Sequence, residues 1–387
     1  MRIGVIGYGL RIQNIVDYLL ACNEDVELAA ITDINWNKVS AQLAEKGRDI
    51  AAIAMYSDAD EMLDKEQLDG VLIGTRCSLH TVMAKKVLQR NLPLYLEKPV
   101  ATTMEDLLSL RDAAECSTSE VVVSFPLRNT ALVRTVKEIV DSGKLGTIEH
   151  VQAINNVPYG GVYFHDWYRD EKETGGLFLQ KSTHDFDYIN YLLGLKPIAV
   201  CAMKSKQIFK GNKPAGLHCK DCEEYKSCPE SPYVLKHIKA EPDMYIQGEM
   251  CSFAVDTGNE DSGSAIIQYE SGMHVSYSQN FYARKTAAAR GARLLGYKGT
   301  LEFDFYTEAI KVHMHNTNRV ETYQLDSSQM SHGGGDAILV DNFIKIMKGE
   351  EKSGTPLSEG LLSALMCLKA TQSAETHTFK TISWEYE

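Results

Sequence analysis

Short apolar runs alternate with amphipathic stretches through the first 125 residues of the chain. The runs are apolar at nearly every position, which is typical of strands that are buried on both faces. Between them, apolar residues recur at the three- and four-residue spacing of a helix, as at Ile12, Ile15, Val16 and Leu19. This alternation predicts a parallel sheet covered by helices. The predicted strands lie within residues 2–9, 26–33, 70–75, 92–99 and 120–126.

The pattern changes after Pro126. One amphipathic stretch at 131–146 predicts a helix, and longer segments follow in which apolar and polar residues alternate. These segments predict an antiparallel sheet with one open face, including hairpins that turn at 270–272 and 298–299. Two helices are expected near the end, at about 336–349 and 357–375. We therefore predict an α/β, doubly wound domain at 1–125 and an α+β domain at 126–387. Helix 357–375 belongs to the second domain and is expected to pack back on the first.

Composition limits the partners and the location of the chain. Its formal net charge of -12 is spread along the sequence, whereas a nucleic-acid site needs clustered Lys and Arg. No apolar run approaches the ~18 residues of a membrane-spanning helix, and the first residues do not resemble a signal peptide. We expect a cytoplasmic protein that acts on small molecules, without nucleic-acid or membrane partners. Its nine cysteines are then expected to be thiols or metal ligands.

The first predicted strand leads into a glycine turn that opens a helix. Gly7 permits the tight turn, and Gly9 lets a pyrophosphate approach the N–H groups at the helix N-terminus. Ile12 replaces the third glycine of the dinucleotide-binding fingerprint. The predicted cofactor contacts in this turn are Gly7, Tyr8, Gly9, Leu10, Arg11 and Ile12.

Asp33 ends the second predicted strand, where an acidic side chain binds the hydroxyls of the adenosine ribose. The alternative is that Asp33 caps the following helix; beside the glycine turn, we favour ribose binding. No arginine follows Asp33 directly, and a carboxylate repels a 2′-phosphate, so NAD is preferred over NADP.

Residues 95–101, "YLEKPVA", place Lys98 at the carboxyl end of a predicted strand. With the glycine turn, Asp33, the loop 75–80 and the Gly175-Gly176 pair before His184, this motif closely resembles the Gfo/Idh/MocA family of oxidoreductases over nearly the whole chain. The resemblance implies a Rossmann domain, an open-sheet substrate domain and a nicotinamide cofactor between them. It also implies sugar, cyclitol or glycoside substrates and a homodimer or homotetramer formed through the open sheet. The further cofactor contacts that it implies are Thr75, Arg76, His80, Glu97 and Lys98.

By this resemblance, Lys98 contacts the nicotinamide ribose and the reacting hydroxyl. Burial at the sheet edge lowers the pKa of a lysine, which suits Lys98 to proton transfer. The alternative is a surface lysine paired with Glu97. Arg76 stands where the family often has proline, and it either contacts an anion or hydroxyl near the cofactor or is solvated.

The segment 175–197, "GGLFLQKSTHDFDYINYLLGLKP", predicts a helix that ends at Gly194. Helical spacing gives it one polar stripe made of Gln180, His184, Asp187 and Tyr191. The resemblance places His184 near the substrate hydroxyl, and the family often has an acid at the position of Gln180. Glutamine can hold a hydroxyl but cannot titrate, so the proton acceptor is His184, Lys98 or both. Asp187 is expected to orient His184 or to cap backbone groups.

Lys181 has two possible roles, as a substrate ligand or as a salt-bridge partner of Asp185 at i+4. The segment 159–176 is dense in aromatic and polar residues, which is typical of sugar binding, although an ordinary loop packed on the sheet is the alternative. Asn129 is a further candidate for the crevice. The predicted substrate residues are Gln180, Lys181, Arg128, Tyr163, His165, Trp167 and Arg169.

Cys219, Cys222 and Cys228 lie in a polar insertion at about 210–240 with the spacing C-x2-C-x5-C. Two cysteines separated by two residues can bind one metal ion, which predicts a structural zinc or, second, an iron–sulfur cluster. The alternative is three reduced thiols in a loop. Candidates for a fourth ligand are His218, His237, Cys251 and Cys201.

Three functions are open at this point. The first is an NAD-dependent oxidoreductase that transfers a hydride between the cofactor and a hydroxyl carbon of a sugar, cyclitol or glycoside. The second is a redox-neutral glycosidase or lyase that oxidises a sugar transiently and recycles NAD. The third is a non-catalytic sensor of sugar and nucleotide. Lys98 and His184, the predicted catalytic residues, argue against the sensor. The first function is the leading hypothesis, and the missing acid at Gln180 keeps the second open.

Overall fold

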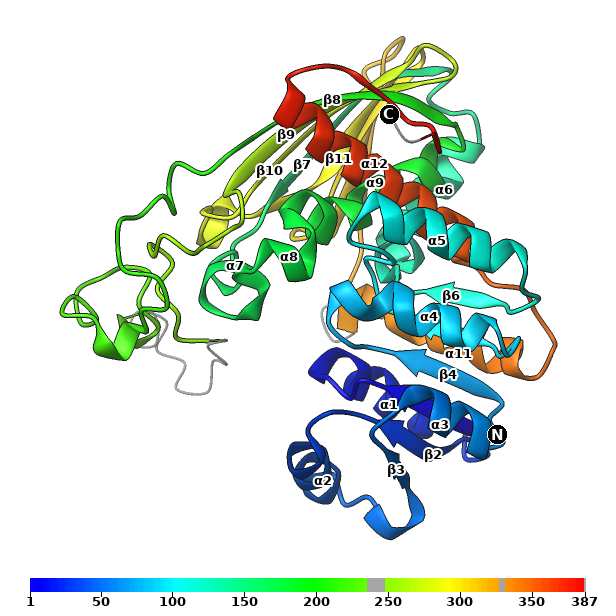
Figure 1. Ribbon diagram of the computed structural model, residues 1–387. Helices are drawn as coiled ribbons and strands as arrows, with labels where there is room; N and C mark the ends of the chain where they lie inside the picture. The colour runs from blue at the N-terminus through cyan, green and yellow to red at the C-terminus, as the bar shows by residue number, and fades with distance from the viewer. Residues whose placement is uncertain (235–247, 327–330, 386–387) are drawn as a thin grey trace.

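The computed structural model describes residues 1–234, 248–326 and 331–385. The N-terminal part contains a six-stranded parallel sheet in the order β3-β2-β1-β4-β5-β6 (Figure 1). Its strands are β1 Arg2–Ile6, β2 Glu27–Thr32, β3 Ala54–Tyr56, β4 Gly70–Ile73, β5 Leu94–Leu96 and β6 Val121–Val123. Its helices are α1 Leu10–Cys22, α2 Trp36–Glu45, α3 Ala59–Lys65, α4 His80–Leu88 and α5 Met104–Glu115.

The parallel sheet is buried on both faces, as its apolar strands predict. Ile3 and Val5 of β1 belong to one apolar core, and Ile6 belongs to the other. Five strands lie where the sequence predicts them. The sixth strand, β3, has three residues that are only partly buried, so no long apolar run marks it.

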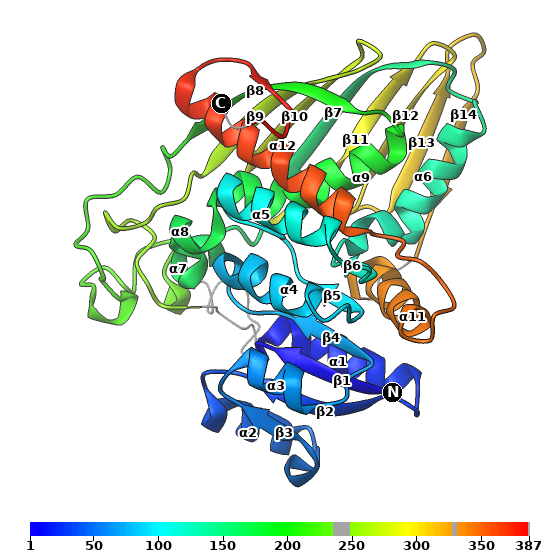
Figure 2. The same ribbon diagram turned by 45° about the vertical axis from the view of Figure 1, so that its right-hand side comes forward.

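Two helices from the end of the chain return to the N-terminal domain. Helix α11, Gly335–Met347, packs beside α1 and supplies Leu339, Val340 and Phe343 to the core on that face. Helix α12, Leu357–Thr376, lies against α5 and β6 as well as against the second sheet. Figures 1 and 2 show α11 beside the parallel sheet and α12 across the junction of the two domains.

The second sheet has nine strands in the order β14-β13-β12-β11-β7-β10-β9-β8-β15, and β7 and β10 form its parallel pair. Both predicted hairpins are present, as β9–β10 and β11–β12. Helices α6 Ala131–Asp141 and α9 Thr183–Leu193 cover one face together with α12 (Figure 2). The strands are β7 Ile148–Asn156, β8 Pro197–Ser205, β9 Ser262–Tyr269, β10 His274–Asn280, β11 Ala289–Gly296, β12 Gly299–Asp304, β13 Ala309–Met314, β14 Val320–Gln324 and β15 Lys380–Thr381.

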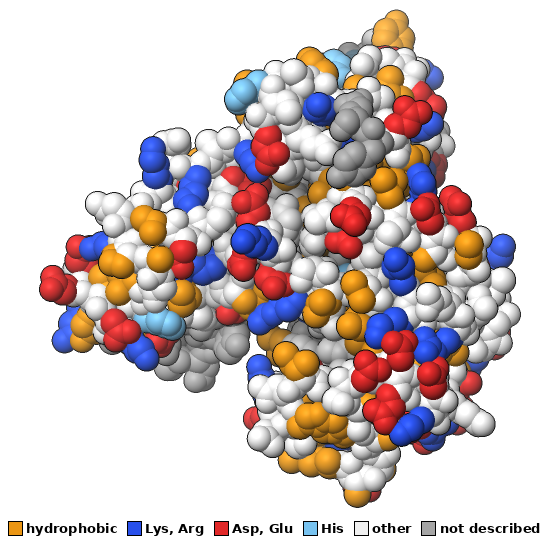
Figure 3. Space-filling model, in the orientation of Figure 1, with side chains coloured by type: hydrophobic (Ala, Val, Ile, Leu, Met, Phe, Trp, Pro, Cys, Tyr) orange, Lys and Arg blue, Asp and Glu red, His pale blue; other side chains and the backbone are white. Residues whose placement is uncertain are grey.

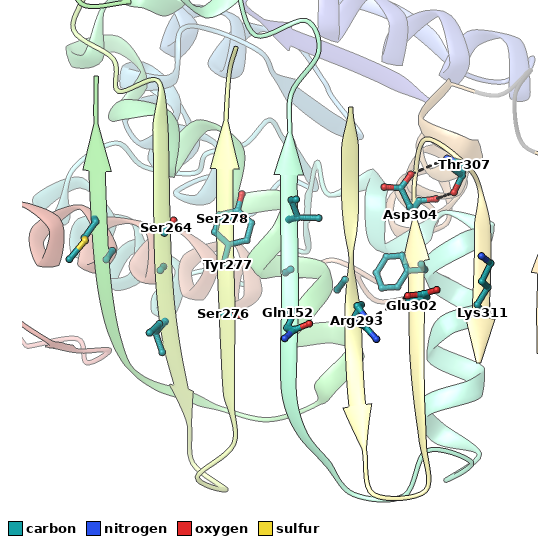
Figure 4. Close-up of a pocket in the computed structure, with 18 of the residues that line it drawn as sticks. Gln152, Ser264, Ser276, Tyr277, Ser278, Arg293, Glu302, Asp304, Thr307 and Lys311 are labelled. Atoms are coloured by element: carbon teal, nitrogen blue, oxygen red, sulfur yellow. Dashed lines mark hydrogen bonds and ion pairs between the residues drawn. The ribbon is translucent and has the colours of Figure 1, made fainter. Parts of the chain in front are cut away.

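No described helix or strand of the chain covers the other face of the large sheet. It carries exposed apolar side chains such as Met203, which is 71% exposed, and Ile266, which is 50% exposed. A shallow hollow of about 870 Å³ lies on this face. Figure 4 shows side chains that line it, among them Arg293 and Glu302, whose charged groups lie 3.5 Å apart. The sheet is therefore open on one face, as its alternating sequence predicts.

Charges of both signs are mixed over the face of the molecule in Figure 3, which agrees with the diffuse acidic composition. The same view shows a hollow between the N-terminal domain, at the bottom, and the loops of the second domain, at the left. Among the described helices, none combines the length and the apolar character that crossing a bilayer requires.

Candidate active site

The glycine turn joins β1 to α1 at the carboxyl edge of the parallel sheet. Gly7 has φ +81°, and a Cβ there would lie 2.8 Å from Cα of Thr75, so only glycine fits. Helix α1 starts after Gly9 with no side-chain cap, and the neighbouring Leu10 is 57% exposed. The first N–H groups of α1 are thus open to an anion, and the turn fits a dinucleotide pyrophosphate.

Ile12 occupies the place of the third glycine without loosening the helix. In the fingerprint, that glycine allows the helix to pack closely on the sheet. Here Ile12 is fully buried, and a Cβ on Gly74 would lie 2.0 Å from Cγ1 of Ile12. The glycine of this contact is therefore Gly74, just after β4, instead of a residue of the helix, and the close packing of helix and sheet is preserved.

Asp33 lies beside the glycine turn at the end of β2. Its carboxylate accepts hydrogen bonds from the N–H groups of Tyr8 and Asn35, each at 2.8 Å. Helix α2 is capped by Asn35, which accepts a hydrogen bond from the N–H of Lys38 at 3.2 Å. The N-cap role considered for Asp33 therefore belongs to Asn35.

His80 joins two loops at the same sheet edge. Its Nδ1 lies 2.7 Å from the carbonyl oxygen of Pro99, and its Nε2 lies 3.3 Å from that of Thr75. The ring is buried, which lowers the pKa of His80. His80 thus positions the Thr75 and Lys98 loops relative to each other.

Arg11 and Glu97 belong to an ion-pair cluster at the start of α11. The Arg11 guanidinium lies 3.1 Å from Glu97 and donates to both carboxylate oxygens of Asp336, at 2.5 and 2.8 Å. These side chains hold the N-terminal ends of α1 and α11 together. Arg11 can still offer its backbone N–H to a cofactor.

Lys98 follows β5 and points to the second domain. Its Nζ donates a hydrogen bond to the carbonyl oxygen of Gln180 at 3.1 Å. Burial, followed by the positive charge of Lys181, lowers the pKa of Lys98 to about 8. Because Glu97 pairs with Arg11, the alternative of a Lys98–Glu97 surface pair does not describe this site.

The helix that carries His184 differs from its predicted form. Residues Phe178–Ser182 form a π-helical turn, and α9 begins after it and ends at Gly194, which has φ +62°. A π turn takes up an extra residue, so the i+4 geometry expected for Lys181 and Asp185 is lost. Lys181 Nζ instead donates to the hydroxyl of Tyr159 at 2.7 Å.

His184 lies between the two domains. Its ring packs edge to face on Phe125 with centroids 5.9 Å apart, and its buried Nδ1 has no hydrogen-bond partner in the described part of the chain. Burial, then the charges of Lys98 and Arg290, lowers the pKa of His184 well below its usual value. The imidazole is therefore neutral near pH 7.

Asp187 neither orients His184 nor caps backbone groups; it pairs with Arg128. Nε of Arg128 donates to Asp187 at 2.8 Å, and the same guanidinium contacts Glu359 of α12. Burial, only partly offset by Arg128, raises the pKa of Asp187 to about 6. Two carboxylates hold the Arg128 guanidinium, so its predicted role as a substrate ligand gives way to that of a structural ion pair.

The predicted sugar platform separates into two groups. His165 bridges the carbonyl of Met250 and the hydroxyl of Ser252, at 2.6 and 3.0 Å, and Arg169 binds Asp256 at 2.7 Å. These two residues tie the segment 159–176 to the segment 250–257.

Trp167 and Tyr163 form the second group, and each ring lies beside a cationic side chain. The Arg76 guanidinium stacks 3.8 Å above the Trp167 ring, which links the two domains across the crevice. Lys181 Nζ lies 5.1 Å from the centroid of the Tyr163 ring. Arg76 is therefore stacked on an aromatic ring, an arrangement that neither role considered from the sequence included.

Comparison with known families decides the identity of the fold. Residues 1–125 match the family described as "Oxidoreductase family, NAD-binding Rossmann fold", and residues 133–302 match the "GFO/IDH/MocA C-terminal domain". The chain belongs to the Gfo/Idh/MocA oxidoreductase family.

Relatives and solved structures agree with this assignment. The chain is 27% identical over 336 residues to the putative oxidoreductase YteT of Bacillus subtilis, covering 77% of each chain. It is 25% identical over 217 residues to an inositol 2-dehydrogenase of Rhizobium meliloti, covering 56% of this chain and 62% of that one. Levoglucosan dehydrogenase, solved with NADH and levoglucosan, has the same fold, with a TM-score of 0.79, 16% identity and 99% of both chains covered.

The described part of the cysteine insertion of this Gfo/Idh/MocA protein does not support the predicted metal centre. Burial, followed by the nearby thiols of Cys251, Cys228 and Cys222, raises the pKa of Cys219 to about 12. Yet no group of three or more Cys, His, Asp or Glu side chains within residues 1–234, 248–326 and 331–385 is arranged to hold a metal ion. The suggested ligand His237 lies outside the described residues. Within the described chain the thiols are free, so zinc and iron–sulfur binding are not supported.

Tyr159 and Arg290 are two residues of the site that the sequence did not predict. Tyr159 lies just beyond β7, and Arg290 lies on β11, 105 residues after Asp185, with which it pairs at 2.8 Å. No local motif marks Arg290, because its place follows from the pairing of β11 with β7. The aromatic density of the segment that begins at Tyr159 was the available signal for that residue. Together, these groups form a cofactor turn and a polar, lysine-containing crevice.

Proposed function

We propose that this chain is an NAD-dependent dehydrogenase that oxidises a hydroxyl carbon of a sugar or cyclitol, or reduces the matching carbonyl. The observation that carries the proposal is Lys98, which has a pKa of about 8 and lies between the cofactor edge of the sheet and the His184 helix. The names of the relatives, which include an inositol dehydrogenase, support the same class of substrate. Because the inositol 2-dehydrogenase and the levoglucosan dehydrogenase are dehydrogenases by name, we propose neither a redox-neutral glycosidase nor a sensor.

The cofactor contacts follow from the N-terminal geometry. The open N–H groups of α1 would bind the pyrophosphate, and Asp33 would bind the adenosine ribose hydroxyls. When bound, the nicotinamide accepts a hydride from the substrate carbon or returns one to it. None of these proposed cofactor contacts comes from the cysteine insertion.

The two candidate proton acceptors differ in their pKa values. A general base works best when its pKa lies near the working pH. Lys98, with a pKa of about 8, meets this condition, whereas the pKa of His184 is well below its usual value. During oxidation, the substrate carbon loses its hydrogen as hydride, the hydroxyl proton passes to neutral Lys98, and a carbonyl remains. Neutral His184 holds the hydroxyl by a hydrogen bond and orients it.

Oxidation should become faster as the pH rises through about 8, because Lys98 must be neutral to accept the proton. In the free enzyme, the fraction of neutral Lys98 is small below this pH and nears saturation above it. Steady-state kcat/KM for the sugar or cyclitol, measured from pH 6 to 10 with saturating NAD, should show this rise. A flat profile would contradict the role of Lys98.

Replacing Asp33 by serine should lower the preference for NAD over NADP by about tenfold or more, because the repulsion between its carboxylate and the 2′-phosphate is removed. The ratio of kcat/KM values for the two cofactors measures this preference. Asp64, which pairs with Arg90 on the outside of the domain, provides the control D64S. An unchanged ratio in D33S would place the adenosine ribose elsewhere.

We also propose that the open face of the large sheet pairs with a second copy of the chain. Ile266 and Met203 are exposed there beside the hollow in Figure 4. Replacing Ile266 by glutamate should lower the mass measured by light scattering, because a charge would be buried in the interface. Val255, which is 61% exposed outside the sheet, provides the control V255E. A single-chain mass for the unmodified protein would refute this interface.

A further inference from the structure

The substrate side of the crevice carries more positive than negative charge. Lys98 and Lys181 both donate to neutral oxygens, the first to a carbonyl and the second to a tyrosine hydroxyl. Asp185 is fully buried, and it accepts hydrogen bonds from Arg290, Asn155 and Tyr277 at 2.7 to 2.8 Å. Its negative charge is therefore already matched by Arg290, and neither lysine pairs with a carboxylate among the described residues.

Two hydrogen-bond donors in this part of the site lack acceptors among the described residues, namely the Tyr159 hydroxyl and Nη2 of Arg290. A charged lysine can only donate, so the hydroxyl oxygen of Tyr159 accepts from Lys181 and the Tyr159 proton must point elsewhere. No acceptor for this proton lies within bonding distance among the described residues. Nη2 of Arg290 is buried and likewise has no partner in the described structure. A buried donor such as Nη2 of Arg290 is costly unless a ligand supplies the acceptor.

The donors lie near one another and near His184. Lys181 follows Gln180, whose carbonyl holds Lys98, and Asp185, the partner of Arg290, follows His184. The charges of Arg290 and Lys181 are both among the causes that lower the pKa of His184. Tyr159 is 48% exposed and therefore lies at the solvent-accessible edge of this cluster.

Two sequence features change the local charge in the same direction. Gln180 contributes no negative charge, and Lys181 adds a positive one. A neutral sugar presents hydroxyls that donate as well as accept, and it cannot balance a charge. A carboxylate has two oxygens that only accept, and it carries one negative charge, which suits side-chain donors of this kind.

We propose that the substrate is a sugar that bears a carboxylate, such as a uronic acid, with the carboxylate bound by Lys181, Tyr159 and Arg290. This inference rests on the dehydrogenase function proposed above and adds the chemical class of the substrate. The carboxylate itself does not react. It anchors the ring so that a hydroxyl carbon lies beside Lys98 and His184.

Binding to the NADH-loaded protein tests the carboxylate site without turnover. Calorimetric titrations at low ionic strength would compare D-galacturonate, D-glucuronate and D-mannuronate with D-galactose, D-glucose and D-mannose. At least one uronate should bind about tenfold or more tightly than its neutral partner. Equal affinities in all three pairs would overturn the inference, as would tighter binding of the sugar 6-phosphates than of the uronates.

Variants locate the anion. K181M should abolish the preference for the uronate, while K172M, a change at an exposed lysine of helix α8 Glu171–Thr174, should leave it intact. Because Arg290 also balances buried Asp185, R290K is used in place of a neutral residue, and its thermal midpoint is measured first. A preference that survives in both K181M and a folded R290K would place the carboxylate elsewhere and overturn the assignment.

Turnover separates this inference from the proposed function. Reduction of NAD by neutral sugars with no preference for uronates would contradict the carboxylate site and leave the dehydrogenase function standing. Uronate binding that depends on Lys181, but without reduction of NAD by any hydroxylated sugar or return of hydride to the matching carbonyl compounds, would contradict the dehydrogenase function and leave the carboxylate site standing.

Discussion

Replacing Lys98 by alanine is expected to lower kcat by about a thousandfold, because the group proposed to take the hydroxyl proton is removed. Lys98 lies at the carboxyl end of β5 with Nζ 3.1 Å from the carbonyl oxygen of Gln180, and its lowered pKa makes the neutral form accessible near pH 8. The turn around Gly7 and Gly9 is unaffected by this change. NADH should therefore bind to K98A with a Kd within about tenfold of the original, measured by fluorescence titration.

Two further variants sharpen this test. K98R keeps the positive charge, but an arginine does not deprotonate in proteins, so it should remain as inactive as K98A. K172A, at the exposed lysine of α8, should keep full activity. If K98R recovered most of the turnover, the charge of Lys98 rather than its proton transfer would be the contribution that matters.

Replacing Arg128 by methionine is expected to destabilise the protein by about 3–5 kcal/mol, because buried Asp187 loses its partner. Asp187 is 2% exposed and accepts from Nε of Arg128 at 2.8 Å. Glu359 also loses a partner, but its side chain is 44% exposed and the cost there is small. Scanning calorimetry should show a lower thermal midpoint.

The destabilisation by R128M should be smaller at pH 5 than at pH 8. Burial already raises the pKa of Asp187 from 3.8 to about 6 in the folded protein, and loss of Arg128 removes the group that opposes this rise. A folded-state pKa above the unfolded value means that the folded state gains protons as the pH falls, so stability returns as Asp187 is neutralised.

A double variant tests the pairing directly. R128M combined with D187N should recover most of the lost stability, since no unpaired buried charge remains. KM for the substrate should stay nearly the same in this double variant, because Arg128 is placed in a structural ion pair and not in the substrate set. A large rise in KM would return Arg128 to the crevice.

The strands of the parallel sheet were readable because burial on both faces leaves an uninterrupted apolar run, as in β1 and β4. The glycine turn and Lys98 were readable because a cofactor edge demands particular residues at particular positions. The π-helical turn at Phe178–Ser182 was not, since one added residue in a turn leaves the apolar pattern nearly unchanged. For the same reason the Lys181–Asp185 salt bridge, one of the two roles considered for Lys181, is not formed; Lys181 contacts Tyr159 and Asp185 pairs with Arg290.

Long-range ion pairs were also beyond the sequence. Arg11 pairs with Asp336, 325 residues further along the chain, and Arg290 with Asp185, 105 residues before it. Such pairs depend on how the two sheets and the last helices are packed, which local periodicity does not contain. The charge of the crevice, and hence the class of substrate inferred from it, became visible only when these partners were known.

Helix α11 is synthesised late but completes the core of the N-terminal domain, which affects how that domain folds during synthesis. The ribosome completes the parallel sheet about two hundred residues before it makes Leu339, Val340 and Phe343, which complete the core on one of its faces. Until then, Gly70, where an added Cβ would lie 2.6 Å from Sδ of Met347, has no helix packed against it. The nascent N-terminal domain therefore exposes apolar surface until the last part of the chain is made, and the cofactor turn and α11 mature together.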